Sequence, residues 1–168
     1  MRLVILFGFL AFIALAIETA VPYWFSLRVL VPNLVVILAV DLGLRHHGAI
    51  PVALAFAMGY ATDALGGTTL GLNAMLITIV YLLAYAVSSR LMVTTAFIGA
   101  VLVFIGALVT TLGGVAIGSG IAALSQASTL FPQFATEAAV SAIVAPVIFA
   151  FLGGLKRVVG LPAGPVRE

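Results

Sequence analysis

Long apolar runs, separated by short polar breaks, dominate this chain. A helix needs about 20 apolar residues to cross about 30 Å of hydrocarbon, and about 17 are tolerated. Breaks at charges, glycines and prolines divide the chain into six candidate membrane helices, at residues 3–21, 30–44, 49–65, 72–87, 93–117 and 134–152. The pattern therefore predicts an all-α integral membrane protein with a six-helix transmembrane domain over residues 1–155 and a short basic cytoplasmic tail over 156–168.

Two segments leave alternatives open. The connection over residues 118–133 is the longest, is rich in Ser and Thr and carries no charge. Periodicity does not decide whether it holds a short interfacial helix. At the N-terminus, Arg2 and the apolar run after it resemble a signal peptide, but the rest of the chain is equally apolar, so we predict an uncleaved first membrane helix.

Composition agrees with a membrane protein, because 64% of the residues are hydrophobic and 7% are charged, against about 25% charged in soluble domains. The seven Lys and Arg residues are dispersed between apolar runs, so they form no basic patch for nucleic acid. If both termini face the cytoplasm, all of these cations except Arg28 lie inside. The charges therefore predict the orientation of the helices.

The most informative stretch is residues 55–73, where an apolar helix leads through an acid into a glycine-rich turn. A carboxylate near hydrocarbon costs about 2.5 to 3.5 kcal/mol on insertion scales, so Asp63 is paired, near water or functional. Gly59 lies on the same helical face, which suits close helix packing. Gly66, Gly67 and Gly71 permit a tight turn. Two roles remain open for Asp63, an internal hydrogen bond that fixes the turn or a direct part in binding a partner or ligand.

The remaining acids of the predicted helices have simpler interpretations. Asp41 and Arg45 are four residues apart, so we expect an ion pair near the inner surface. Glu18 and Glu137 are expected near the outer face, with Arg28 as the outer cation. They are either solvated at the interface or form a polar cluster that pairs with Arg28 or binds a partner.

Chemistry beyond packing and binding finds little support in the sequence. His46 and His47 are adjacent and no acid or cysteine completes a metal set, and the chain contains no cysteine at all. The Gly118-Ser119-Gly120 segment has no histidine at outer depth to act as a base, and a Walker A motif is absent. We expect no catalytic residue, no metal and no cofactor.

These residues together resemble the bacterial rod shape-determining protein family MreD. The resemblance is most specific over residues 31–90, and beyond that it is architectural. It depends on Pro32-Asn33-Leu34, on the Gly59-x-x-x-Asp63 face, on the Gly67-Thr68-Thr69-Leu70-Gly71 turn and on Asn73. In many relatives an aspartate stands where this chain has Asn33, so this chain lacks a carboxylate at that position.

The resemblance implies a multi-pass protein of the bacterial plasma membrane that takes part in cell elongation and lateral peptidoglycan synthesis without catalysing it. The implied partners are MreC above all, with MreB, RodA and a class B penicillin-binding protein in a larger complex. It also implies a fold similar to the substrate-binding subunits of energy-coupling-factor vitamin transporters. Membrane lipid is a further expected contact, and self-association into a homodimer is left open.

Three functions follow from these expectations. The first is a scaffold whose small-residue faces bind the single membrane helix of MreC. The second is a substrate-binding subunit of a vitamin transporter, with a pocket near the outer face below the turn at Gly66 to Gly71. The third is a scaffold that keeps such a pocket for a lipid or a lipid-linked precursor.

Overall fold

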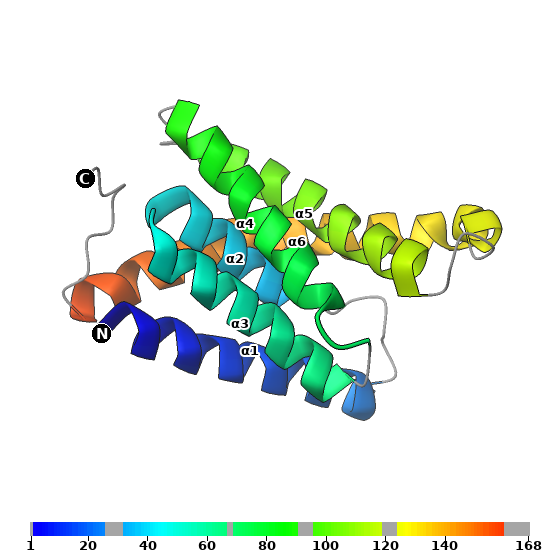
Figure 1. Cartoon of the computed structure of the whole chain (residues 1–168), viewed down its shortest axis with the longest axis horizontal. Coiled ribbons are helices and arrows are strands. Elements are labelled where there is room, and N and C mark those ends of the chain that lie inside the picture. Colours follow the sequence, from blue (N-terminus) through cyan, green and yellow to red (C-terminus); the bar gives the residue numbers. More distant parts are fainter. Residues whose placement is uncertain (1, 26–31, 67–68, 91–95, 119–123, 160–168) are drawn as a thin grey trace.

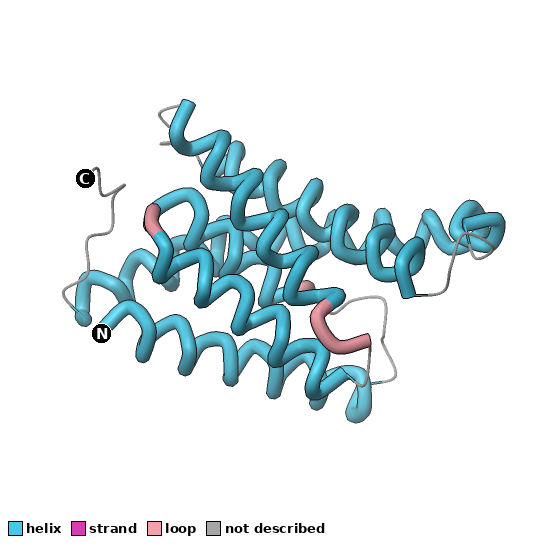
Figure 2. Tube along the Cα trace, viewed as in Figure 1, coloured by secondary structure: helices cyan, strands magenta, loops and turns pink. Residues whose placement is uncertain are grey.

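The computed structural model describes residues 2–25, 32–66, 69–90, 96–118 and 124–159, which form six α-helices and, in these ranges, no strand (Figure 1). A short turn joins α2 to α3, and residues 69–71 lead into α4 (Figure 2). The bounds are α1 (Arg2–Phe25), α2 (Leu34–Arg45), α3 (Ala49–Gly66), α4 (Leu72–Arg90), α5 (Ala96–Gly118) and α6 (Leu124–Val159). The prediction of an all-α protein is confirmed.

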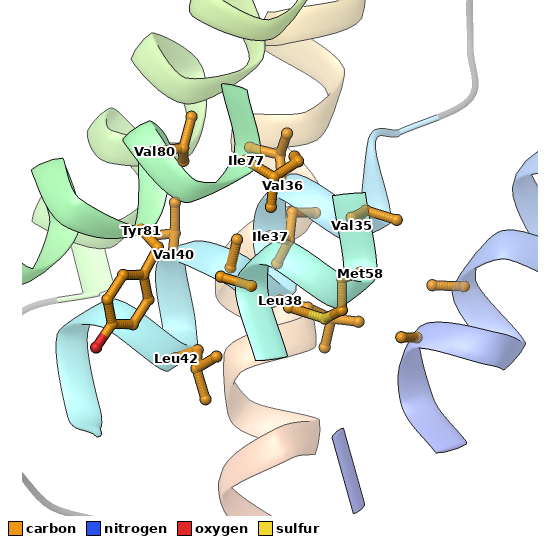
Figure 3. Packing of buried hydrophobic residues seen from close by; sticks show 14 of the residues in the cluster. Val35, Val36, Ile37, Leu38, Val40, Leu42, Met58, Ile77, Val80 and Tyr81 are labelled. Atoms are coloured by element: carbon orange, nitrogen blue, oxygen red, sulfur yellow. The ribbon is translucent and has the colours of Figure 1, made fainter. Parts of the chain in front are cut away.

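Helix α2 forms the centre of the bundle and packs against all five other helices. Its residues 35–43 are all buried, because Val, Ile, Leu and Ala occupy every face of the helix before Asp41. A helix that is apolar all round belongs in the core of a bundle. Val36, Val40, Ile77 and Val80 are among the core side chains that pack between α2 and α4 (Figure 3).

Close approach of α4 to α2 depends on Gly43. A Cβ added at this position would lie 2.6 Å from the carbonyl oxygen of Tyr81 and 2.8 Å from the Cβ of Ala84. Because one of these atoms belongs to the α4 backbone, the contact cannot relax by a change of side-chain rotamer. Gly43 therefore fixes the distance between the central helix and α4.

Five of the six described helices, all except α2, are long and apolar enough to cross a membrane. The described part of α2 has 12 residues, or about 18 Å at 1.5 Å per residue, and residues 26–31 before it lie outside the described part. A multi-pass membrane protein is confirmed by these five helices, whereas a sixth crossing stays a prediction.

Two predicted boundaries differ from the structure. The second helix was expected to begin at residue 30, but α2 begins at Leu34, directly after Pro32 and the cap residue Asn33. The sixth helix was expected to begin at residue 134, with the form of the 118–133 connection left open, but α6 already begins at Leu124 and continues through Pro132. Periodicity did not decide this segment because it is polar and contains a proline.

The start of α1 and the end of α6 lie at the same end of the bundle as the α2–α3 turn and the end of α4 (Figure 1). Arg45, Arg90 and Arg157 therefore lie at one end. Lys156 was expected in a cytoplasmic tail, but α6 continues to Val159, so Lys156 belongs to the helix and its side chain is fully buried. Residues 160–168 of the predicted tail lie outside the described part.

Candidate functional site

Asp63 on α3 accepts four hydrogen bonds from the start of α4. Its Oδ2 accepts from the backbone N–H groups of Gly71 at 2.9 Å and Ala74 at 3.2 Å. Its Oδ1 accepts from the backbone N–H of Asn73 at 3.1 Å and from the Asn73 side-chain amide at 3.0 Å. The first N–H groups of a helix have no partner within the helix, and an anion there also interacts favourably with the helix dipole. A buried carboxylate thus caps α4 from the neighbouring helix.

Gly59 brings α3 close enough for this cap to form. A Cβ at Gly59 would lie 2.5 Å from the carbonyl oxygen of Asn73 and 2.6 Å from the Cα of Ala74. Both atoms belong to the α4 backbone, so any side chain here would push α4 away. Because Gly59 precedes Asp63 by one helical turn, the close contact and the hydrogen bonds lie on the same face of α3.

The turn between α3 and α4 uses the glycines that the sequence singled out. Gly66 is the last residue of α3, and Gly71 adopts φ +93°, which favours glycine. The Leu72 N–H donates to the Thr69 carbonyl at 3.2 Å. Gly67 lies outside the described residues. These hydrogen bonds of Asp63 run to backbone and side-chain groups of the same chain. They are of the kind expected if Asp63 fixes the turn, which was the first of the two roles left open for it.

A second capping site surrounds the N-terminus of α2. The Oε1 atom of Glu18 on α1 accepts from the backbone N–H groups of Leu34 and Val35, the latter at 3.2 Å. Asn33 is the N-cap residue, and its Oδ1 accepts from the Val36 N–H at 3.0 Å. The Asn33 N–H donates to the Oγ of Ser141 on α6 at 2.9 Å. In hydrocarbon every backbone polar group needs a hydrogen-bond partner. Side chains from α1, from the cap of α2 and from α6 supply the partners for the N-terminus of α2.

The predicted polar cluster of Glu18, Arg28 and Glu137 stays a prediction. The Glu137 carbonyl accepts from the Ser141 hydroxyl within α6 at 2.9 Å. Arg28 lies outside the described residues. Glu18 is half-buried and binds the backbone of α2, a role that neither of its predicted alternatives included. Asn33 acts as a cap, for which Asn and Asp are about equally suited.

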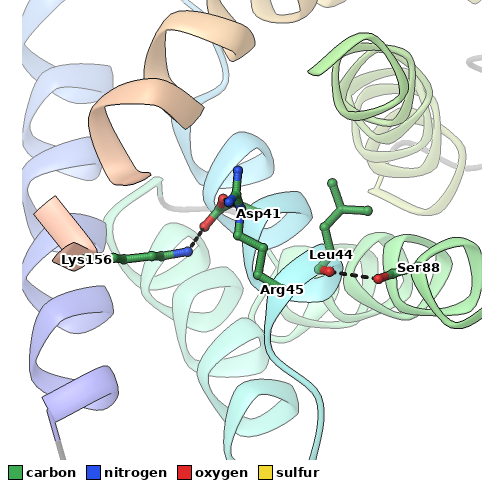
Figure 4. Close-up of polar contacts among 5 residues, drawn as sticks. All are labelled: Asp41, Leu44, Arg45, Ser88 and Lys156. Carbon is green, nitrogen blue, oxygen red and sulfur yellow. Dashed lines mark hydrogen bonds and ion pairs between the residues drawn. The ribbon is translucent and has the colours of Figure 1, made fainter. Parts of the chain in front are cut away.

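The C-terminal end of α2 holds a buried charge cluster (Figure 4). The predicted ion pair between Asp41 and Arg45 is confirmed, with Oδ1 and Nε 2.8 Å apart. The other carboxylate oxygen of Asp41 binds the Nζ of Lys156 on α6, and both Asp41 and Lys156 are almost completely buried. Lys156 also lies over the Phe7 ring of α1, 5.1 Å from its centroid. Helices α1, α2 and α6 therefore meet around one carboxylate.

Side chains from α4 cap the carbonyl groups at the same end of α2. The Ser88 hydroxyl donates to the Leu44 carbonyl at 2.7 Å, and the Tyr81 hydroxyl donates to the His46 carbonyl at 3.1 Å. His46 itself is buried. Burial, with the nearby Lys156 charge, lowers the pKa of His46 from 6.5 to about 4. His46 is therefore neutral at physiological pH.

This arrangement uses its polar groups to hold helices together. The carboxylates of Glu18, Asp41 and Asp63 all bind N–H groups or cations of the chain itself. Within the described residues, no group of three or more His, Asp or Glu side chains is placed to hold a metal ion. The chemistry that these groups support is helix capping and charge pairing inside the bundle.

Sequence reasoning missed several residues that the structure brings into these sites, among them Gly43, Ser141 and Lys156. Gly43 has a readable signal, because a glycine inside an apolar helix costs about 1 kcal/mol relative to alanine and suggests close packing. Ser141 and Lys156 contact residues 108 and 115 positions away. Their contacts depend on the folded bundle, and spacing along one helix does not reveal them.

Comparison with known proteins gives one family. The family model described as "rod shape-determining protein MreD" matches residues 1–154 of the chain. Searches of curated proteins and of solved structures gave no match. The expected similarity to the substrate-binding subunits of energy-coupling-factor transporters therefore stays a prediction.

Proposed function

The chain belongs to the rod shape-determining MreD family, and from this premise we propose that it is a non-catalytic scaffold of the cell-elongation machinery in the bacterial plasma membrane. In this proposal it binds MreC and helps to control lateral peptidoglycan synthesis. MreB, RodA and a class B penicillin-binding protein join the same larger complex.

The observation that carries the proposal is the family match, which extends over the whole helical bundle up to Gly154 in α6. The interior adds support, because the buried polar groups are used to fix one helix against another. A protein that gathers partners needs a rigid surface, and capping of α2 and α4 from neighbouring helices provides rigidity.

The partner surface is proposed to lie on the apolar outer faces of the bundle. Helix association in lipid depends on close packing and on interhelical hydrogen bonds, because lipid is as apolar as the side chains. Gly59 and Asp63 face α4, so we assign them essential packing that keeps the outer faces in place. Their effect on MreC binding is then indirect.

The orientation is proposed from the cations at the shared end of α1, α2, α4 and α6. Positive charge favours the cytoplasmic side, so this end faces the cytoplasm and the α3–α4 turn faces outward. A reporter fused after Arg90 should then report the inside, and one fused after Gly118 the outside. The opposite pattern would refute this orientation.

Affinity purification after mild detergent extraction tests the function. Tagged wild-type protein is expected to recover MreC, and Gly59→Leu is expected to recover less of it per molecule of tagged protein in the membrane. Thr62→Ala is the matched control on the same helix, because Thr62 is half-buried and its hydroxyl donates to the Met58 carbonyl within α3 at 3.0 Å.

Two results would contradict the proposal. One is recovery of an ATPase-module membrane partner together with a bound vitamin, which would support a transporter subunit. The other is normal rod shape in cells whose only copy is Gly59→Leu at wild-type protein level, which would show that the face around Gly59 is dispensable.

A further inference from the structure

We propose that the last turn of α6, residues 155–159, is a latch that Lys156 closes on Asp41 and that anionic lipid headgroups open. The starting observation is the buried ion pair between α6 and the central helix. A lysine whose side chain is fully buried at the end of a membrane helix is unusual, because such side chains normally extend to the headgroup region.

Asp41 has two cationic partners, and this makes two states accessible. Arg45 binds Oδ1 at 2.8 Å while Lys156 binds Oδ2. When Lys156 leaves, Asp41 retains Arg45, so its charge is not left without a partner. The two cations also repel each other across the shared carboxylate, which favours departure of one of them.

The hinge of the latch is the pair Gly153 and Gly154. An added Cβ would meet nothing within 4 Å at either position, so packing does not require glycine there. Glycine is the poorest helix former after proline, and two in succession weaken the helix directly before Lys156. Phe149 and Leu152, before the hinge, are buried in the core and hold the rest of α6 in place.

The released state places the lysine where membrane lysines normally lie. Lys156, near the end of α6, reaches the headgroup region in this state and carries the positive charge there. Anionic headgroups attract such cations within about a Debye length of the surface. Because anionic lipid interacts better with the released state than with the closed one, it shifts the population towards release.

Distances between spin labels test the latch. The chain has no cysteine, so two introduced cysteines are the only labelled sites. Ile50→Cys, exposed on α3, serves as the reference. It is paired with Arg157→Cys after the hinge or with Phe151→Cys, exposed on α6 before the hinge. The proteins are measured in nanodiscs of phosphatidylcholine alone and with added phosphatidylglycerol.

We expect phosphatidylglycerol to increase a second population of the Arg157 pair, displaced by about one helical turn, or about 5 Å, while the Phe151 pair stays unchanged. Asp41→Asn should increase the same population in phosphatidylcholine. Gly153→Ala with Gly154→Ala should remove it, because the hinge becomes helical.

The lipid series on the otherwise wild-type background keeps the test decisive even if Asp41→Asn fails to fold. An Arg157 distribution that is identical in both lipids would overturn the latch. Equal shifts at Phe151 and Arg157 would also overturn it, because the whole of α6 would then move and the glycine pair would not be a hinge.

Discussion

Replacement of Asp63 gives the sharpest test of how α3 and α4 are held together. Asp63→Ala removes the acceptor for the four hydrogen bonds from Gly71, Asn73 and Ala74. A hydrogen bond to a charged group contributes about 1.5 to 3 kcal/mol, and the contributions of bonds to one group are not additive. Because water at the turn can replace part of these bonds, we expect a loss of about 3 to 5 kcal/mol in the free energy of unfolding.

Asp63→Asn should lie between wild type and Asp63→Ala. Its amide oxygen can still accept from the Asn73 N–H and side-chain amide, but its NH₂ group faces the N–H groups of Gly71 and Ala74. Two donors then lack an acceptor, which costs about 2 to 3 kcal/mol. The assay is unfolding in mixed micelles with increasing SDS mole fraction, followed by pulse proteolysis.

Thr62→Ala is the matched control, because Thr62 is adjacent and its hydroxyl only donates to the Met58 carbonyl within α3. It should change the free energy of unfolding by about 0.5 kcal/mol or less. If Asp63→Ala unfolds like Thr62→Ala, the capping argument is refuted. If it is equally stable but no longer recovers MreC, the direct binding role of Asp63 gains support in its place.

Three further predictions use the same unfolding measurement. Gly59→Ala should lower the free energy of unfolding by about 1 to 3 kcal/mol, because the added methyl group overpacks against α4. Gly114→Ala should raise it by about 0.5 to 1 kcal/mol, because an added Cβ there meets no atom within 4 Å. Equal effects of the two variants would contradict the packing argument. Glu18→Gln keeps an acceptor for the first N–H groups of α2 and should cost at most about 1 kcal/mol, while Glu18→Ala should cost about 2 to 3 kcal/mol. The pKa of His46 in the folded protein lies near 4, below its ordinary value of 6.5. Its contribution to stability is therefore complete above pH 6.5 and is lost as pH falls towards 4. His46→Gln should flatten this part of the pH profile of stability, and an unchanged profile would contradict the lowered pKa of His46.

Local patterns in the sequence were sufficient for much of the fold. The apolar runs of the third and fourth helices end within a few residues of the observed ends, because charges and glycines interrupt them. The Asp41–Arg45 pair followed from its i, i+4 spacing. The prominence of Gly59 and Asp63 also followed from local spacing and that of Asn73 from the family resemblance, and the structure brings these residues together at one helix contact.

What the sequence left open depends on contacts between distant segments. No local rule relates Lys156 to Asp41, so the cation pattern placed Lys156 in a tail. The start of α2 at Leu34 was missed because apolar residues continue on both sides of Asn33, and only its cap marks where the helix begins. The sequence left Glu18 either in solvent or in a polar cluster, because the N–H groups that donate to its carboxylate lie on another helix.

The dependence of α2 on its neighbours has a consequence for biosynthesis. Its N-terminal cap includes Ser141 and its C-terminal charge cluster includes Lys156, which the ribosome adds 108 and 115 residues after their partners Asn33 and Asp41. During translation the middle helix therefore waits in the bilayer with incomplete polar partners. Chains that stop before α6 should be unstable intermediates that membrane proteases remove, so mature protein accumulates only after the last segment has inserted.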